Sequence, residues 1–166
     1  MRKMRLQKRE IRDNQKIQEL IEICRVVRVG AVDQEGMFIV PVNYGYDLTE
    51  REDGTLGWKI YFHSAKEGRK AEAFANNPNV ALELDREGGV IKGDYTCSYS
   101  FAYQSIMGNG RLRKLETEEE KRRGLERIME HLAPEADIEF EEEMLKAADV
   151  YCIEDISFTA KERKAK

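Results

Sequence analysis

The sequence predicts an antiparallel β-barrel with attached helices, and two observations point to this fold. Segments in which apolar and polar side chains alternate with a period of two recur along the chain, and turn-length connections join several of them. Helical patterns stand between groups of strands and do not alternate with single strands, which disfavours a parallel βαβ sheet. Neither a Gly-x-Gly-x-x-Gly fingerprint nor a P-loop occurs in the sequence.

The composition is that of one globular domain spanning residues 1–166. Hydrophobic residues make up 41% of the chain and charged residues 36%, which allows a core and is not typical of a disordered protein. The net charge of −4 gives no general reason to expect nucleic acid or an anionic membrane as a partner. No apolar run approaches the roughly 18 residues that cross a bilayer.

The cysteines and histidines argue against a metal site. Cys24, Cys97 and Cys152 are scattered, odd in number and without Cys-x-x-Cys spacing, which disfavours a zinc knuckle or a disulfide framework. His63 and His131 are the two histidines, and they are far apart in the sequence. We therefore expect a cytoplasmic protein without a metal centre.

The first part of the chain is expected to form a basic arm, a helix and a hairpin. Residues 1–12 carry many basic side chains and are expected to be a solvated arm, which packs late or against a partner subunit. Asp13 is a suitable N-cap for a helix with one apolar stripe. Strands are expected at 26–32 and 37–46, and Pro41 in the second indicates a sheet edge, a bulge or backbone that faces a ligand.

The later elements follow from alternation, turn residues and helix caps. In order, we expect a charged loop at 47–57, a strand at 56–63, a helix at 71–75, a strand at 79–85, a turn at 86–89, a strand at 97–111, a helix from Thr117, a short helix through Lys146, a strand at 150–158 and a charged tail at 160–166. Gly108 and Gly110 stand at alternate positions of one strand. They indicate either that a bulky group passes close to that face or that the strand bends at a barrel corner.

A candidate anion site lies where a strand runs directly into a helix. Ser64 ends the strand, and Arg69 and Lys70 open the helix that follows. Free backbone N–H groups at a helix start favour an anion, and a hydroxyl, a guanidinium and an ammonium at the same point would suit a phosphate. The alternative is an ordinary strand–helix junction with solvated basic side chains, and these residues alone leave both interpretations open.

Four segments resemble a known family of flavoproteins. They are Val40-Pro-Val-Asn-Tyr44, Tyr61-Phe-His-Ser-Ala65, Glu67-Gly-Arg-Lys70 and Tyr103-Gln-Ser-Ile-Met-Gly-Asn-Gly110. With the Asn-Asn-Pro sequence that follows the helix, they resemble the pyridoxamine 5′-phosphate oxidase-like FMN-binding split barrels. Within that group they are similar to the 5-nitroimidazole resistance (Nim-type) branch. The resemblance covers about residues 10–130 and is strongest over 40–80.

The resemblance implies a fold, a cofactor and a subunit arrangement. The fold would be α+β and mainly β, a six-stranded antiparallel split β-barrel with flanking helices, which forms a homodimer with FMN bound between the subunits. By match of motif, the phosphate would be held by Ser64, Arg69 and Lys70. Two further residues, Val42 and Asn43, would lie along the flavin ring. His63 would lie near the cofactor or the substrate, and Ser105 would approach FMN from the same or the second subunit.

Two departures limit what the resemblance implies. The chain lacks, after Phe158, the Arg-x-His pattern with which oxidases of the pyridoxine pathway bind the substrate phosphate, so vitamin B6 oxidation is not expected. Gln104 stands where many Nim-type relatives have a basic residue. The second departure leaves open whether that strand contacts a phosphate or the substrate.

The function that these features predict is that of an FMN-dependent oxidoreductase able to reduce nitroaromatics such as 5-nitroimidazoles. A flavin carries the redox chemistry itself, so no catalytic dyad or metal cluster is required. His63 would be the candidate proton donor, although a histidine at a strand end is more often a structural hydrogen-bonding group. A nicotinamide electron donor is compatible with this function.

Two alternatives remain on the same fold. One is a non-catalytic flavin or haem carrier or sensor, in which His63 would be an axial haem ligand. The other keeps the enzyme and replaces FMN by a deazaflavin.

Overall fold

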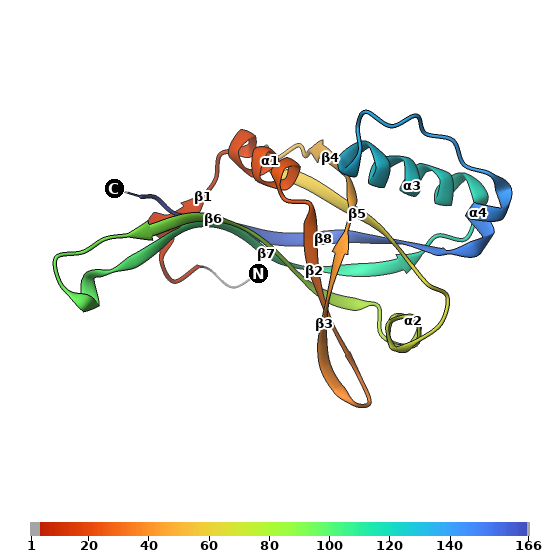
Figure 1. Cartoon of the computed structure of the whole chain (residues 1–166), viewed down its shortest axis with the longest axis horizontal. Coiled ribbons are helices and arrows are strands. Elements are labelled where there is room, and N and C mark those ends of the chain that lie inside the picture. The colour runs from red at the N-terminus through yellow and green to blue at the C-terminus, as the bar shows by residue number, and fades with distance from the viewer. Residues whose placement is uncertain (1–3, 166) are drawn as a thin grey trace.

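The computed structural model describes residues 4–165, which form one twisted antiparallel sheet with helices around it (Figure 1). The strands are β1 (Glu10–Ile11), β2 (Val26–Asp33), β3 (Gly36–Asn43), β4 (Gly45–Glu50), β5 (Leu56–Ser64), β6 (Asn79–Ile91), β7 (Ser100–Lys114) and β8 (Asp149–Arg163). The helices are α1 (Asn14–Ile23), α2 (Arg69–Asn76), α3 (Glu118–Leu132) and α4 (Glu142–Ala147), with short 3₁₀ turns η1 (Gln7–Arg9) and η2 (Thr96–Ser98).

The strands follow the order β3-β2-β6-β7-β8-β5-β4, and β1 pairs with β8 outside this path. All pairs are antiparallel, which confirms the mainly β, antiparallel architecture. The two edge strands, β3 and β4, are not hydrogen-bonded to each other, so the barrel is open. Pro41 lies on edge strand β3, where its missing N–H is tolerated.

The sheet has eight strands instead of six because two segments pair that the sequence did not identify as strands. The strand expected at 37–46 is interrupted at Tyr44, and residues 45–50 form a separate strand, β4, which pairs with β5, although charged side chains indicated a loop from residue 47 on. Glu10 and Ile11 pair with β8, and the Ile11 side chain is buried in the core. The basic segment expected as a solvated arm at 1–12 therefore joins the sheet through Glu10 and Ile11. Its residues 1–3 lie outside the described residues.

The end of the chain also differs from expectation. Strand β8 continues to Arg163, so most of the charged tail expected at 160–166 belongs to the sheet. Residue 166 lies outside the described part. None of the helices in residues 4–165 is long and apolar enough to cross a membrane.

Two apolar clusters hold the fold together, one on each side of β5. The inner cluster fills the barrel, and α1 and α2 close it through Ile21 and Phe74, respectively. The outer cluster contains Tyr61, Val150 and Ile128, and lies under α3. Every second side chain of β5 from Leu56 to Phe62 belongs to the inner cluster, which explains why the apolar alternation was clear in the sequence, and Tyr61 belongs to the outer cluster.

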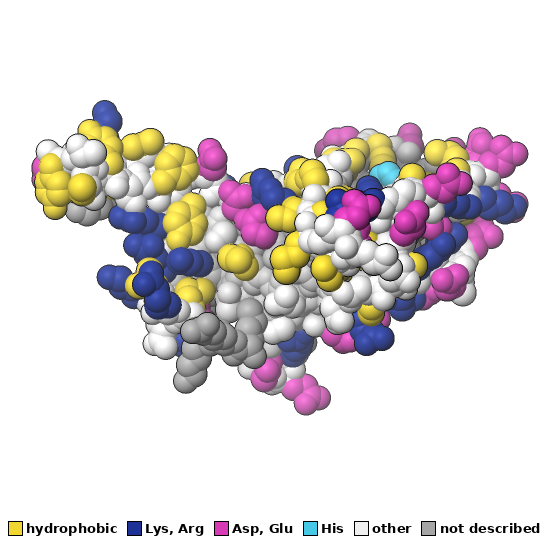
Figure 2. Space-filling model, turned by 90° about the horizontal axis from the view of Figure 1, so that it is seen from below, with side chains coloured by type: hydrophobic (Ala, Val, Ile, Leu, Met, Phe, Trp, Pro, Cys, Tyr) yellow, Lys and Arg dark blue, Asp and Glu magenta, His cyan; other side chains and the backbone are white. Residues whose placement is uncertain are grey.

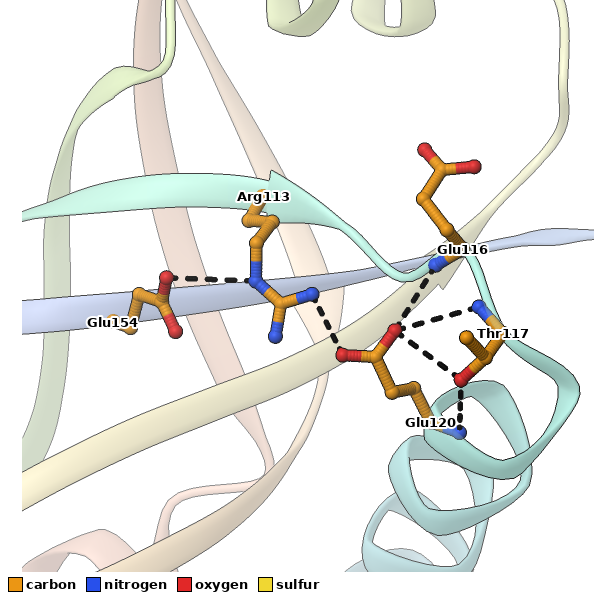
Figure 3. Close-up of polar contacts among 5 residues, drawn as sticks. All are labelled: Arg113, Glu116, Thr117, Glu120 and Glu154. Atoms are coloured by element: carbon orange, nitrogen blue, oxygen red, sulfur yellow. Dashed lines mark hydrogen bonds and ion pairs between the residues drawn. The ribbon is translucent and has the colours of Figure 1, made fainter.

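The expected capping box at the start of α3 is present and is joined to the sheet (Figure 3). The Glu120 backbone N–H donates to Thr117 Oγ1 at 3.2 Å, and the Glu120 carboxylate accepts from the Thr117 backbone N–H at 3.4 Å. Arg113 on β7 donates to the same carboxylate at 2.8 Å and pairs with Glu154 on β8 at 3.4 Å. The cap therefore also fixes the helix to two strands.

The segment expected to turn at 86–89 instead continues as strand. A bulge between Glu87 and Gly89 shifts the β6–β7 register, and β6 then runs on to Ile91. A Cβ at Gly88 would lie 2.9 Å from the Ala102 Cβ, so the bulge needs a residue without a side chain there. The end of this hairpin, the arm formed by residues 89–101, protrudes from the body of the molecule (Figure 1).

The two alternate glycines of β7 admit the neighbouring strand. A Cβ at Gly108 would lie 2.7 Å from the Ser157 carbonyl oxygen, and one at Gly110 would lie 2.5 Å from the Ile153 side chain. The β7–β8 register also shifts between Asn109 and Arg111. Of the two interpretations from the sequence, the bend with close packing is the one that the structure supports.

Candidate functional site

Ser64 carries a buried hydroxyl group that has no partner within residues 4–165. It ends β5, and its side chain points into the barrel, with 4% of the residue exposed. A buried hydroxyl without a hydrogen bond is costly, and in native proteins such a group usually has a partner such as water or a ligand. The site around Ser64 is therefore suited to an additional acceptor or donor.

Helix α2 begins five residues later, at Arg69, and its N-cap is Gly68 with φ of 101°. This left-handed backbone conformation favours glycine. The N-cap supplies no side-chain hydrogen bond to the first turn. Free N–H groups at the start of α2 therefore add to the attraction for an anion.

Arg69 is held in one orientation by residues of the β2–β3 hairpin. Its Nε and Nη2 atoms lie 2.6 and 2.9 Å from the two carboxylate oxygens of Asp33. The guanidinium group also lies over the Phe38 ring, 4.5 Å from its centroid. The hydrogen bond from Arg69 lowers the pKa of Asp33. Arg69 Nη1 stays free of close contacts and lies 3.9 Å from the Glu35 carboxylate.

Lys70, the second cation of the junction, is half-buried and makes no ion pair within the described part of the chain. The structure thus separates the two adjacent cations, which the sequence suggested would act alike. Arg69 already has a carboxylate partner, whereas the Lys70 charge is uncompensated by a direct contact. Among the three residues proposed for the anion site, Ser64 has no hydrogen-bond partner and Lys70 no ion-pair partner within residues 4–165.

Asp149 lies next to Ser64 on the adjacent strand, and its charge is compensated. The two residues are directly opposite in the β5–β8 ladder, and Asp149 is buried. Lys114 Nζ lies 2.8 Å from the Asp149 carboxylate, and this contact raises the pKa of Lys114. Because Lys114 neutralises the carboxylate, Asp149 does not by itself prevent an anion from binding beside Ser64.

His63 lies on the face of β5 opposite to Ser64. Successive side chains of a strand point to opposite faces, and the His63 side chain is exposed, whereas Ser64 is buried. His63 shares its face with Tyr61, which packs under α3. Within one chain, the fold therefore places His63 and Ser64 on opposite sides of the sheet.

Val42 and Asn43 likewise point to opposite faces, here of β3. Val42 packs against the inner cluster on the same face as Phe38, which lies under Arg69. The Asn43 side-chain amide donates to the Arg25 carbonyl at 2.9 Å. Val42 is therefore the one of the two that shares a face with the anion site.

Ser105 is distant from Ser64 in the same chain. It pairs with Lys161, which lies twelve positions along β8 from Asp149, the partner of Ser64. Twelve positions of extended strand span about 40 Å. Of the two expectations for Ser105, only contact from a second subunit remains compatible with this placement.

Comparison with known proteins identifies the family. The sequence model for pyridoxamine 5′-phosphate oxidase matches residues 13–162. The chain belongs to the pyridoxamine 5′-phosphate oxidase family. Its fold is the flavin-binding split barrel of this family, although with eight strands. No curated protein matches the sequence.

Solved structures place the chain in the 5-nitroimidazole resistance branch of the family. A candidate 5-nitroimidazole antibiotic resistance protein from Bacteroides thetaiotaomicron is 30% identical, with a TM-score of 0.74, and the match covers 92% of this chain and 86% of that one. A NimC/NimA family protein from Clostridium acetobutylicum is 16% identical, with a TM-score of 0.53 and coverage of 92% and 87%. An FAD and heme binding protein from Mycobacterium smegmatis shares the fold, at 15% identity, a TM-score of 0.79 and coverage of 95% and 74%.

The structure of this pyridoxamine 5′-phosphate oxidase family member adds site features that the sequence did not reveal. Asp33 and Phe38 hold Arg69, and a cavity of about 530 Å³ lies between the hairpin that carries Asp33 and α2. An apolar groove of about 400 Å³ follows Gly30, Ile39 and neighbouring residues on the outer side of the sheet. Gly30, which has no side chain, was the one feature of the sequence that could have indicated the groove. No pattern in the sequence near Asp33 or Arg69 indicated that these two residues are in contact.

No metal centre is evident in the described residues. They contain no group of three or more His, Cys, Asp or Glu side chains that could hold a metal ion. Both ring nitrogens of His131 contact backbone carbonyl oxygens, of Tyr44 at 2.7 Å and of Glu22 at 2.9 Å. This histidine joins α3 to α1 and to the start of β4. Cys24 and Cys152 are buried, and Cys97 is exposed on the arm formed by residues 89–101.

Proposed function

We propose that this protein is an FMN-dependent oxidoreductase that reduces nitroaromatic compounds such as 5-nitroimidazoles. The observation that carries the proposal is the buried, unpartnered hydroxyl of Ser64 beside the uncompensated charge of Lys70 at the start of α2. The flavin-binding fold of the family supports a flavin in this place. The 30% identity to the candidate resistance protein supports the class of substrate.

The residues of the junction fit the phosphate group of FMN. Ser64 would donate its hydroxyl hydrogen to a phosphate oxygen and thereby gain the partner that it lacks. Lys70 would contribute an ammonium charge, and Arg69 would present Nη1 while Asp33 fixes its other side. The N–H groups of the first turn of α2 would complete the anion site.

Bound FMN would supply the redox chemistry, which leaves positioning and exclusion of water to the protein. Val42 would offer an apolar surface to the ring, because it lies on the face of β3 that also carries Phe38. The Asn43 side chain lies on the opposite face of β3, so it would contact the flavin ring only if the ring extended to that face. His63 would act as a proton donor only toward a group bound on the outer face of β5, since its side chain points away from Ser64.

We further propose the assembly and setting in which this site would work. Two copies would form a homodimer with the cofactor at their interface, and Ser105 would then approach FMN from the second copy. A nicotinamide nucleotide would be a suitable electron donor and a nitroaromatic small molecule a suitable substrate. We expect neither nucleic acid nor membrane as a partner, and a cytoplasmic location.

The absorption spectrum of the purified protein, before and after addition of FMN, tests this function. We expect flavin bands that correspond to about one FMN per chain. A nicotinamide donor supplied anaerobically should reduce the flavin and bleach these bands, and a nitroimidazole added afterwards should reoxidise the flavin and restore them. A Soret band would indicate haem instead, and binding of a deazaflavin in preference to FMN would change the cofactor. A protein that remains colourless after incubation with FMN would contradict the proposal.

A further inference from the structure

Strands β5 and β8 pair along only part of their length. Their ladder ends at Ile60 and Ile153, although both strands continue beyond these residues. On the same side, β8 pairs again only at Ala160 and Lys161, with β1. Within the described chain, no strand therefore pairs with residues 154–159 on this side of β8, and an opening separates β8 from the start of β5.

A bulge in β8 accounts for the opening. Asp155 has a φ of 53°, a left-handed conformation that aspartate adopts more readily than most residues. Ile153 and Ile156 both belong to the inner cluster, so two residues instead of one stand between successive inward side chains. A bulge bends the strand that carries it, and the bend directs the rest of β8 away from β5.

A cavity of about 460 Å³ lies in this opening. Its volume is within the range of small-molecule sites. The cavity lies at the opposite end of β5 from Ser64, eight positions or about 26 Å along the strand, so it is separate from the proposed cofactor site. Apolar side chains form much of its wall, namely Ile11, Ile17, Leu56, Ile156, Phe158 and Ala160.

The acidic side chains at the rim of the cavity already have partners. The Glu10 carboxylate accepts from Arg12 at 2.7 Å. The Asp53 carboxylate accepts from the Thr55 backbone N–H at 3.0 Å and from its hydroxyl at 2.6 Å. These hydrogen bonds, and in addition the charge of Arg51, hold the pKa of Asp53 below its ordinary value. Neither carboxylate is therefore left to attract a cationic ligand.

Arg51 is the basic residue of the rim that makes no ion pair within residues 4–165. Its side chain passes over the outward face of β5, where a Cβ at Gly57 would lie 3.4 Å from its Nε. Its Nη2 donates to the Ile156 carbonyl at 3.5 Å, a long contact. Arg51 thus extends from the end of β4 to β8 at the mouth of the opening, and most of its N–H donors remain available to a ligand.

Exposed apolar side chains also gather on the arm formed by residues 89–101 (Figure 2). The arm is a protruding hairpin, however, whereas a small ligand binds in a concave site that covers most of its surface. The cavity between β5 and β8 is concave and combines an apolar wall with one unpaired guanidinium group. Guanidinium groups bind carboxylates through two parallel hydrogen bonds.

We infer that this cavity binds a small carboxylic acid with an apolar body. The carboxylate lies on Arg51, and the apolar body lies between Leu56 on β5 and Phe158 on β8. The site does not include the flavin or the residues of the β5–α2 junction, so it is additional to the proposed function.

Trp58, the single tryptophan of the chain, can report on this cavity. Its ring lies edge-on to Phe158, with 5.6 Å between the ring centroids, and its side chain shares the inner face of β5 with Leu56. The indole N–H is buried and has no hydrogen-bond partner within the described residues. A ligand that enters beside Phe158 should therefore change the fluorescence of Trp58.

The experiment compares three eight-carbon probes that differ in charge: octanoate, octan-1-ol and octylammonium. In calorimetric titrations of the full-length protein as purified, octanoate should bind most tightly and octylammonium most weakly, and octanoate should change the Trp58 emission. Arg51→Gln should weaken octanoate binding about tenfold, because a charge-assisted hydrogen bond is lost, and should leave octan-1-ol binding unchanged. Arg122→Gln, which removes an exposed arginine of α3, is the matched control and should bind octanoate as wild type does.

Three results would overturn the inference: no binding of octanoate at millimolar concentration, equal affinity for octanoate and octan-1-ol, or equal affinity of the two glutamine variants for octanoate. Arg51→Glu is a second variant, and it should bind octylammonium more tightly than octanoate. Circular dichroism checks that each variant is folded. Flavin content, measured on the same samples, separates this site from the proposed function. A flavin-free protein that binds octanoate would contradict the function alone, and a flavin-loaded protein that does not bind octanoate would contradict this site alone.

Discussion

At the scale of single residues, Ser64 connects stability with binding. Its buried hydroxyl has no partner within the described chain, so removing it should relieve a desolvation cost. We expect Ser64→Ala to leave the flavin-free protein as stable as wild type, or more stable by up to about 1 kcal/mol. The same variant should bind FMN about tenfold more weakly, because a hydrogen bond to a charged phosphate is lost.

Thermal unfolding of the flavin-free protein and fluorescence titration with FMN measure the two effects of Ser64→Ala separately. Ser64→Thr keeps the hydroxyl and is the matched control for binding. If Ser64→Ala lost stability and bound FMN as wild type does, the hydroxyl would have a structural partner and no role toward a phosphate.

Asp33 is the second residue whose role can be isolated. It fixes Arg69 through two hydrogen bonds, and Phe38 supports the guanidinium from below. We expect Asp33→Asn to weaken FMN binding severalfold, because Arg69 would lose the carboxylate that fixes its guanidinium group. Glu35→Gln is the control and should leave FMN binding unchanged, since the Glu35 carboxylate lies 3.9 Å from Arg69, too far for a hydrogen bond. Tighter FMN binding by Asp33→Asn would mean that Asp33 competes with the phosphate for Arg69.

The pKa of Asp33 also predicts how this contact depends on pH. Because Arg69 lowers that pKa, the contribution of the pair to stability is present above the ordinary pKa of an aspartate and is lost as the pH falls through the lowered value. The contact should therefore be intact throughout the neutral range. Any change in FMN affinity between pH 6 and 8 must then come from other groups, such as the phosphate itself.

At the scale of elements, the N-cap of α3 is a contact that can be tested without touching the site. Thr117→Ala removes the acceptor of the Glu120 backbone N–H and one side of the capping box. We expect a loss of about 1 kcal/mol in the free energy of unfolding, measured by urea denaturation, and no change in flavin content. Thr117→Ser should restore stability. A loss of flavin in Thr117→Ala would mean that α3 affects the site.

The capping box also illustrates what could be predicted from the sequence. The Thr117 cap, the alternation of β5 and the helical stripe of α1 are local patterns, and the structure confirms all three. Strand β4 was missed beyond Tyr46 because its apolar alternation is limited to Tyr46 and Leu48, and the charged residues around Leu48 indicated a loop. The segment is strand through its pairing with β5. The Glu87–Gly89 bulge was interpreted as a turn, because local sequence cannot show that β7 continues the ladder beyond it.

The candidate site also combines features that local sequence could predict with contacts that arise only in the folded chain. Ser64, Arg69 and Lys70 lie within seven positions of one another, so their proximity was predictable from the strand–helix junction. The contact between Arg69 and Asp33 joins residues 36 positions apart, and it exists only because the β2–β3 hairpin reaches α2. Which face of a strand a residue occupies was also decisive, since it separates His63 from Ser64.

At the scale of the whole molecule, cofactor binding and folding should be separable. The proposed phosphate site lies where β5 ends, whereas the inner cluster and the strand pairing hold the fold. We expect Arg69→Ala combined with Lys70→Ala to lose FMN during purification while remaining a folded dimer. Lys66→Ala, an exposed lysine in the same β5–α2 connection, is the matched control and should retain FMN.

The measurement for this double variant is the thermal shift on adding FMN, together with the sedimentation coefficient. A ligand that binds only the folded state stabilises it by about 2.7 kcal/mol when present at a hundredfold excess over its dissociation constant. Wild type and Lys66→Ala should therefore melt at a higher temperature with FMN, and the double variant should not. Because Arg69 also anchors the hairpin through Asp33, a small drop in the melting temperature without FMN is expected for the double variant. Stoichiometric flavin in the double variant would show that the phosphate binds elsewhere, and a monomeric double variant would show that the β5–α2 junction supports the dimer.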